Sequence, residues 1–303
     1  MVEFLTPTAC MATIRAHGAV VLWRWRKRFR GLCVAVSVYR FLIDPFFAML
    51  VEVVDDYESL SDRAADVVID QIRSKPDSVL GFATGGTPMG LYDRLIEAHK
   101  TRGLDFSKLT TFNLDEYVGL PPEHEQSYAH YMWSNLFDHV NVNPSYVHIP
   151  HGMARDVDEH CRWYERRIEE AGGIDLQILG IGANGHIAFN EPGSSLGSRT
   201  RIKTLASKTV EDNARYFDDP DMVPEYAITM GVGTIMEADT LLLLASGERK
   251  ATAMKKTIEG PITAMVPASI VQLHRFSHVV IDEDAASKLD YRHHHGIAEP
   301  KEK

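Results

Sequence analysis

The pattern of apolar and polar residues along the chain changes at Met49. Residues 49–54 form a short apolar run that is typical of a buried strand, and residues 55–74 carry apolar side chains at helical spacing. The apolar face of that expected helix consists of Leu60, Ala64, Val67, Val68 and Ile72. Residues 23–30, in contrast, mix basic and aromatic side chains at neither period. We therefore expect a compact domain to begin at Met49.

Further apolar runs follow, and segments with helical spacing or turn residues separate them. The runs are residues 78–83, 109–114, 174–181, 240–245 and 278–281. Continuous apolar strands that alternate with helices predict a mostly parallel sheet with helices on both faces. We expect one α/β domain over residues 49–290. In such a sheet, ligands bind beyond the carboxyl ends of the strands.

The two ends of the chain fall outside this pattern. Residues 1–48 are compatible with upstream sequence translated from a wrongly assigned start, with a disordered basic extension, or with an organelle-targeting peptide. The first two interpretations are favoured because the segment lacks a signal-peptide layout. Residues 291–303 include three consecutive histidines, and we expect a solvated tail there rather than a metal site.

Composition narrows the class of protein. The 303 residues are 45% hydrophobic, which is enough for a sizeable core, and the formal net charge of -10 argues against a nucleic-acid-binding surface. Cys10, Cys33 and Cys161 fit neither a disulfide framework nor a zinc site, so a reducing cytoplasm is the simplest location. Because arginines interrupt the one candidate region, we expect no membrane-spanning helix.

A glycine-rich turn follows the run at residues 78–83. Its sequence is Thr84-Gly85-Gly86-Thr87-Pro88, in which Thr87 suits a helix N-cap and Pro88 the first helical position. The two glycines would then expose backbone amides at a helix N-terminus, a geometry that binds phosphate. An ordinary strand-to-helix turn has the same features, so this motif alone leaves both interpretations open.

Adjacent carboxylates follow the run at residues 109–114. We expect Asp115 and Glu116 to lie where a strand gives way to a loop, with one of them facing the cleft. A turn or cap aspartate is the common alternative at such a position.

The run at residues 174–181 leads into the pattern GxGxxG at residues 180–185, which suggests a dinucleotide site. Pro192 and Gly193 contradict that interpretation, because they break the helix that would hold the pyrophosphate. His186 and Glu191 instead share one short loop, in which a carboxylate can orient an imidazole and favour its protonation. A purely structural His–Glu pair fits this loop equally well.

Taken together, several motifs in order resemble the glucosamine-6-phosphate deaminase family. They are GFATGGTPMG (81–90), TFNLDEYVGL (111–120), GHIAFNEPGSSL (185–196), SRTRIKTL (198–205) and GVGTIMEADTLLLLASGERK (231–250). The resemblance extends from about Met49 to Asp282, and such an ordered set is far more specific than any single motif. It implies a doubly wound, Rossmann-like sheet and conversion of glucosamine 6-phosphate to fructose 6-phosphate and ammonia.

The resemblance also implies roles for individual residues. The substrate phosphate would bind Thr84, Gly85, Gly86, Thr87, Arg215 and Lys250. Asp115 resembles the base that moves a proton between carbon-2 and carbon-1 of the opened sugar, and His186 the acid that opens the ring, with Glu191 as its partner. The amine of the substrate supplies the electron sink, so the reaction requires no metal and no organic cofactor.

Asn184 departs from the family pattern, in which many members have an aspartate. The change removes one negative charge beside His186, so its imidazolium should lose a proton more easily. In the pH profile of activity, the limb that depends on this acid should therefore lie at a modestly lower pH than in an Asn184→Asp variant.

Some family members are hexamers that N-acetylglucosamine 6-phosphate activates. Ser194, Arg201 and Lys203 match part of their effector site, although the sequence after Leu289 differs from those members. Arg201 and Lys203 are equally compatible with ion pairs at a subunit interface. The sequence is therefore compatible with a hexamer and with a monomer. Residues 205–226, which include Arg215, resemble the mobile lid of the family.

Two competing functions share features with this sequence. The 6-phosphogluconolactonases have the same scaffold and a Gly-His loop, but they lack the carboxylate that Phe189-Asn190-Glu191-Pro192 supplies. A sugar-phosphate-sensing regulator would keep the phosphate contacts and dispense with Asp115 and His186. A deaminase would release ammonia from glucosamine 6-phosphate, a lactonase would hydrolyse the lactone, and a regulator would bind the sugar phosphate without turnover.

Overall fold

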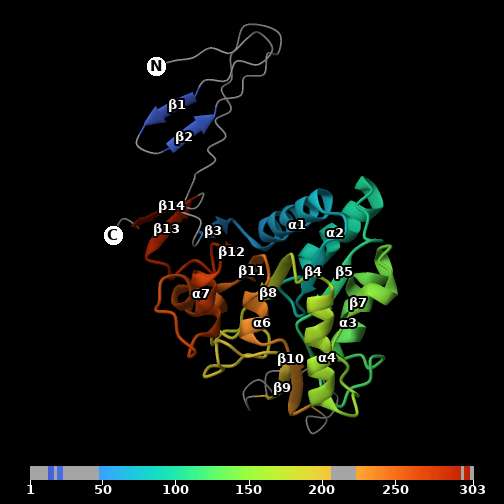
Figure 1. The fold of residues 1–303 in the computed structure, drawn as a ribbon. Coiled ribbons are helices and arrows are strands. Elements are labelled where there is room, and N and C mark those ends of the chain that lie inside the picture. Colours follow the sequence, from blue (N-terminus) through green and yellow to red (C-terminus); the bar gives the residue numbers. More distant parts are fainter. Residues whose placement is uncertain (1–12, 17–18, 23–47, 206–222, 295–296, 301–303) are drawn as a thin grey trace. The chain divides into compact units, whose positions relative to one another are not determined.

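The computed structural model describes residues 13–16, 19–22, 48–205, 223–294 and 297–300 (Figure 1). The chain divides into two compact units, Met1–Phe46 and Phe47–Lys303. In the first unit, β1 (Thr13–Ala16) and β2 (Ala19–Leu22) form an antiparallel hairpin. The predictions for the origin of residues 1–48 stay predictions.

The second unit is built on a seven-stranded sheet in the order β3-β12-β11-β8-β4-β5-β7. Its strands are β3 (Ala48–Val54), β4 (Val79–Phe82), β5 (Thr110–Asn113), β7 (Val147–His148), β8 (Leu176–Gly180), β11 (Thr240–Ala245) and β12 (Phe276–Asp282). Every neighbouring pair is parallel. This confirms the predicted sheet; only the two-residue β7, which has no apolar run, was missed.

Helices connect these strands. They are α1 (Tyr57–Ser74), α2 (Met89–Arg102), α3 (Tyr128–Asn135), α4 (Val157–Glu170), α6 (Val232–Met236) and α7 (Ala251–Ile258), with short 3-10 helices η1 (Phe137–His139), η2 (Pro144–Tyr146), η4 (Glu248–Lys250) and η5 (Pro267–Leu273). The connections that contain α1, α2 and α3 lead from strand to strand toward β7, at one edge of the sheet. The connections that contain α4, α6 and α7 lead back toward β3, at the other edge. Right-handed crossovers therefore place these two groups on opposite faces. Helix α1 packs against α2, as Figure 1 shows.

The direction of winding reverses between the neighbouring strands β4 and β8. The chain leaves β4 toward one face of the sheet and leaves β8 toward the other, so the two loops diverge. Such a switch point opens a crevice at the carboxyl ends of the strands, where α/β proteins bind their ligands.

A second, antiparallel sheet in the order β6-β10-β9 was not predicted. It contains β6 (Asp115–Tyr117), β9 (Arg201–Thr204) and β10 (Tyr226–Thr229). We expected Asp115 and Glu116 where a strand gives way to a loop, but after Leu114 the chain continues into a second strand, in which Asp115 pairs with Thr229 of a distant segment. Only Leu114 separates β5 from β6, and its carbonyl accepts a 2.7 Å bond from Met230 N.

Residues 291–300, where we expected a solvated tail, contain the hairpin of β13 (Tyr291–His294) and β14 (Ile297–Pro300). In the part of the chain that the structure describes, no helix has the length and apolar character needed to span a membrane.

Candidate active site

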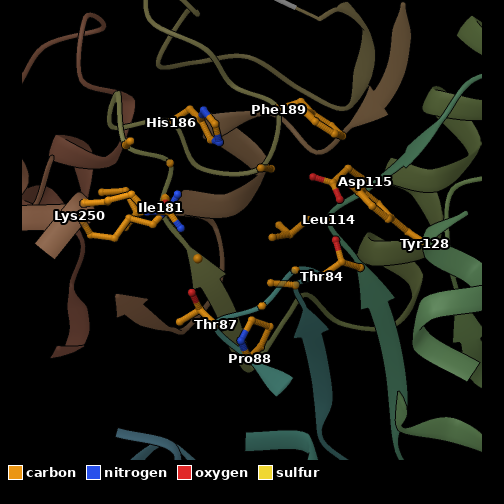
Figure 2. Close-up of a pocket in the computed structure, with 18 residues that line it drawn as sticks. Thr84, Thr87, Pro88, Leu114, Asp115, Tyr128, Ile181, His186, Phe189 and Lys250 are labelled. Carbon is orange, nitrogen blue, oxygen red and sulfur yellow. The ribbon is translucent and has the colours of Figure 1, made fainter. Parts of the chain in front are cut away.

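A cavity of about 380 Å³ opens at the switch point, which is a typical size for a small-ligand site. Its walls come from the ends of β4, β5 and β8 and from the turn after β11 (Figure 2). Seven of the residues predicted from the sequence line it: Thr84, Gly85, Gly86, Thr87, Asp115, His186 and Lys250. Long-range folding therefore brings the predicted phosphate turn, the carboxylate and the imidazole to one space.

The glycine-rich turn lies at the N-terminus of α2, a helix of 14 residues. Gly85 has a φ of 98°, which favours glycine, and a Cβ atom at Gly85 or Gly86 would meet no other atom within 4 Å. The predicted cap was wrong by one residue: Pro88 is the N-cap, and its carbonyl accepts a 3.0 Å bond from Tyr92 N. Thr87 is therefore outside the helix and faces the cavity. The turn and the helix together favour an anion.

Lys250 lines the same cavity as this turn, and its Nζ donates a 2.6 Å hydrogen bond to the carbonyl of Ile181. Burial, and secondarily the charge of Arg249, lower the pKa of Lys250. The turn before it is fixed by Asp282, whose Oδ1 accepts a 3.0 Å bond from Gly247 N. Arg249 also lines the cavity, and we missed it because exposed arginines carry no local signal.

Asp115 is 7% exposed, and Figure 2 shows its side chain directed into the cavity. Burial, with a further contribution from the charge of Glu116, raises the pKa of Asp115 to about 8. A carboxyl group with a pKa near the working pH is suited to taking up and returning a proton.

Glu116 points the other way, because successive residues of a strand face opposite sides. Its carboxylate accepts hydrogen bonds from Tyr117 N and Tyr128 N, both at 2.9 Å, and from Ala129 N at 2.8 Å. Burial raises the pKa of Glu116 to about 7, although these three donors act against the shift. Glu116 therefore anchors the start of α3, and Asp115 is the carboxylate that faces the cleft.

The imidazole of His186 lies against Gly182. A Cβ atom at Gly182 would lie 2.3 Å from His186 Cε1, so this glycine makes room for the ring. His186 Nδ1 is 3.5 Å from Glu191 Oε1, an ion-pair distance. Asn184 Nδ2 donates a 2.7 Å bond to Glu191 Oε2, and Asn184 Oδ1 accepts a 3.2 Å bond from His186 N. Glu191 and Asn184 thus contact each other and His186, and together they restrict the position of the imidazole ring.

Two aromatic side chains that were not predicted from the sequence complete the wall of the site. The rings of Tyr128 and Phe189 stack at 6.0 Å with an interplanar angle of 8°, and both residues line the cavity. Ala188, at the turn before Phe189, has a φ of 49°, an uncommon value for a residue other than glycine. The pairing depends on a contact between α3 and a loop far along the chain, so no local pattern reveals it.

Five other predicted residues lie within the described part of the chain and do not line the cavity: Asn184, Glu191, Ser194, Arg201 and Lys203. Arg215 and most of the predicted lid lie outside the described residues. Arg201 Nη2 donates a 2.9 Å bond to Asn190 Oδ1, and Lys203 lies two residues further along β9, on the same side of the strand. Ser194 Oγ is buried and has no hydrogen-bond partner among the described residues. The described residues contain no group of three or more His, Cys, Asp or Glu side chains arranged to hold a metal ion.

Comparisons with known proteins give a consistent result. The sequence profile of the family described as glucosamine-6-phosphate isomerases/6-phosphogluconolactonase matches residues 55–280. A glucosamine-6-phosphate deaminase from Thermoanaerobacter sp. (strain X514) is 52% identical over 241 residues, covering 80% of this chain and 95% of that protein. One from Clostridium botulinum (strain Loch Maree) is 51% identical over 244 residues, covering 80% of this chain and 100% of that protein.

Solved structures agree. A monomeric glucosamine-6-phosphate deaminase superposes with a TM-score of 0.78 and 48% sequence identity, covering 79% of this chain and 100% of that chain. The 6-phosphogluconolactonase from Trypanosoma brucei has a TM-score of 0.65 at 17% identity, covering 80% of this chain and 99% of that chain, so that likeness concerns the fold alone.

Proposed function

The chain belongs to the family of glucosamine-6-phosphate isomerases and 6-phosphogluconolactonases, and we propose that its reaction is the deaminase reaction. It converts glucosamine 6-phosphate and water to fructose 6-phosphate and ammonia, a step in amino-sugar catabolism. Relatives with about half of their residues identical are deaminases, whereas the lactonase likeness is one of fold. The observation that carries the proposal is the placement of Asp115 and His186 on one cavity with the glycine-rich turn.

The phosphate of the substrate binds in the turn Thr84–Thr87. The N-terminus of α2 supplies a favourable dipole, and Lys250, which lines the same cavity, supplies a positive charge. Arg249 reaches the same cavity and is a further cation for the phosphate. Arg215 stays a predicted phosphate ligand from the resemblance, outside the described residues.

Ring opening comes first. His186 lines the cavity, and Glu191 Oε1 lies 3.5 Å from its Nδ1, where the carboxylate orients the imidazole ring. The Nε2 proton passes to the ring oxygen of the sugar while the bond from that oxygen to carbon-1 breaks, and the hydroxyl group on carbon-1 releases its proton to water as it becomes the aldehyde. The product of this step is the open-chain amino aldose.

Isomerisation follows on the opened sugar. The Asp115 carboxylate removes the proton from carbon-2, the electron pair forms the double bond between carbon-1 and carbon-2, and the aldehyde oxygen accepts the displaced electrons and takes up a proton, which gives the enolamine. The same carboxyl group then returns a proton to carbon-1 and leaves an iminium at carbon-2. Water adds to that carbon, and ammonia departs. Tyr128 and Phe189 pack beside Asp115 and keep its surroundings apolar.

An ammonia-coupled assay with glucosamine 6-phosphate tests the proposal directly. We expect ammonia and fructose 6-phosphate in equal amounts, and no hydrolysis of 6-phosphogluconolactone above the uncatalysed rate. Lactone hydrolysis without ammonia release would support the lactonase alternative. Binding of the sugar phosphate without turnover would support a regulator.

We also propose that the protein acts as a cytoplasmic monomer, like the solved deaminase that is described as monomeric. Arg201 already bonds to Asn190 within its own chain, which is consistent with that state. A hexamer in size-exclusion chromatography with light scattering would contradict it. Ser194, Arg201 and Lys203 stay a predicted effector site, and a fall in KM on addition of N-acetylglucosamine 6-phosphate would support that assignment.

A further inference from the structure

Tyrosine hydroxyl groups hold the glycine-rich turn from outside the cavity. Tyr131 Oη, on α3, donates a 2.7 Å hydrogen bond to the carbonyl of Gly85, and Tyr57 Oη, at the start of α1, donates a 3.0 Å bond to the carbonyl of Gly86. Tyr92 Oη, on α2, donates to the carbonyl of Ala83. These tyrosines are not among the residues that line the cavity. Tyrosines from three helices therefore bind carbonyl groups just before the turn and at its two glycines.

Each of these bonds fixes the direction of a backbone amide. A peptide bond is planar and trans, so its N–H group points opposite to its carbonyl. Holding the carbonyl of Gly85 orients the N–H of Gly86, and holding the carbonyl of Gly86 orients the N–H of Thr87. These amides belong to the turn that the proposed function assigns to the phosphate.

The turn has little other support at its two glycines. A Cβ atom built on Gly85 or Gly86 would meet none of the described atoms within 4 Å, so no side chain crowds these two positions on that side. Glycine has the widest choice of backbone conformations of any residue, and an anion-binding turn works only if its amides already point at the ligand. Hydrogen bonds to the two carbonyls supply that order.

We propose that Tyr57 and Tyr131 are positioning residues that set the phosphate-binding conformation of the turn at Gly85 and Gly86. The inference rests on the proposed phosphate site. Tyr57 has a second role, because its Oη also accepts a 2.8 Å bond from Gly90 N in the first turn of α2. One hydroxyl thereby joins the glycine-rich turn to the helix whose N-terminus faces the anion.

The variants Tyr57→Phe and Tyr131→Phe test this, because each removes one hydroxyl group and keeps the ring. We expect the KM for glucosamine 6-phosphate to rise about 3- to 10-fold in each and further in the double variant. The kcat should stay within about 2-fold, because the phosphate is remote from the reacting carbons and contributes equally to ground-state and transition-state binding. Tyr146→Phe is the matched control, since its side chain is exposed and no hydrogen bond to its hydroxyl is found among the described residues.

Inorganic phosphate provides a readout that is independent of turnover. Its dissociation constant, measured by calorimetry, should rise in the two variants by the same factor as KM. If the wild-type protein binds phosphate but releases no ammonia, the proposed function fails while this inference is still tested by the variants. Unchanged phosphate affinity in a double variant that retains its thermal unfolding transition would overturn it, as would a loss confined to kcat.

Discussion

Asp115 and Glu116 are neighbours on β6 that point to opposite sides of the strand, one carboxylate to the cavity and the other to the backbone amides at the start of α3. Both are buried, and the charge of Glu116 contributes to the raised pKa of Asp115. The second carboxylate therefore has two effects, because it fixes the helix that carries Tyr128 and it makes the cavity carboxylate more basic.

Replacing Glu116 with glutamine should lower the pH at which activity appears. The neutral side chain removes a charge that raises the pKa of Asp115, so the acidic limb of kcat/KM should move down by roughly one pH unit. Burial, which is the larger cause, persists, so the limb should not reach that of an ordinary aspartate. The measurement is a pH profile of kcat/KM.

The same variant should be less stable. The amide group cannot accept all three backbone hydrogen bonds, so a buried N–H at the start of α3 loses its partner at a cost of about 1–3 kcal/mol in unfolding free energy. Glu123→Gln, which changes an exposed glutamate, is the control and should alter neither property. An acidic limb that is identical in Glu116→Gln and wild type would show that Glu116 does not tune Asp115.

Asp115→Asn should lose turnover by about 10³-fold or more, because Asp115 is the only carboxylate among the described residues that line the cavity. Phosphate binding should persist, since the turn at Gly85 is untouched. Asp138→Asn, at an exposed aspartate, is the control. Ammonia release close to the wild-type rate in Asp115→Asn would contradict the assigned base.

The same variant has a consequence for stability. The pKa of Asp115 is about 8 in the folded protein and near 3.8 in the unfolded chain, so folding becomes less favourable as pH rises through this window. Removing the carboxyl group should therefore raise the melting temperature by a few degrees at pH 8 and by little at pH 4. Thermal unfolding at the two pH values measures this, and an equal change at both would be inconsistent with it.

Asn184→Asp should shift the limb of the pH profile that depends on protonated His186. An aspartate would place a second carboxylate about where Asn184 Nδ2 now donates its 2.7 Å bond to Glu191, and this adds negative charge beside the histidine ring. The alkaline limb of the wild type should then lie below that of the variant. Asn143→Asp is a suitable control, because aspartate also caps a helix at this exposed position. Superimposable profiles would refute the effect.

Gly182→Ala should impair catalysis more than binding. The new methyl group would lie 2.3 Å from His186 Cε1, so the ring must move away from Glu191 and the ring oxygen of the substrate. We expect kcat to fall by at least about 10-fold with a smaller change in KM. Gly197→Ala introduces the same group where no atom lies within 4 Å, and it should leave kcat unchanged. Equal kcat values in both variants would show that the imidazole position is not critical.

The amino-acid sequence was enough to predict six of the seven strands of the large sheet and to name candidate residues at the ends of those strands. Strands that are buried on both faces appear in the sequence as apolar runs. The turn at Gly85 and Gly86 needs backbone angles that favour glycine, and the two glycines indicate this directly. These features are local, because each depends on residues within one short segment. For the same reason the sequence identified Asp115 and His186 as candidate site residues but gave no information on the distance between them.

The tertiary structure alone decided which residues face one another. Asp115 turns to the cavity and Glu116 away from it because β6 pairs with β10, more than a hundred residues later in the chain. The stacking of Tyr128 on Phe189 and the bonds from Tyr57 and Tyr131 to the glycine-rich turn also join distant segments. Such contacts leave no periodic signal, since the pairing partner of a residue is set by how whole elements pack and not by its neighbours in the chain.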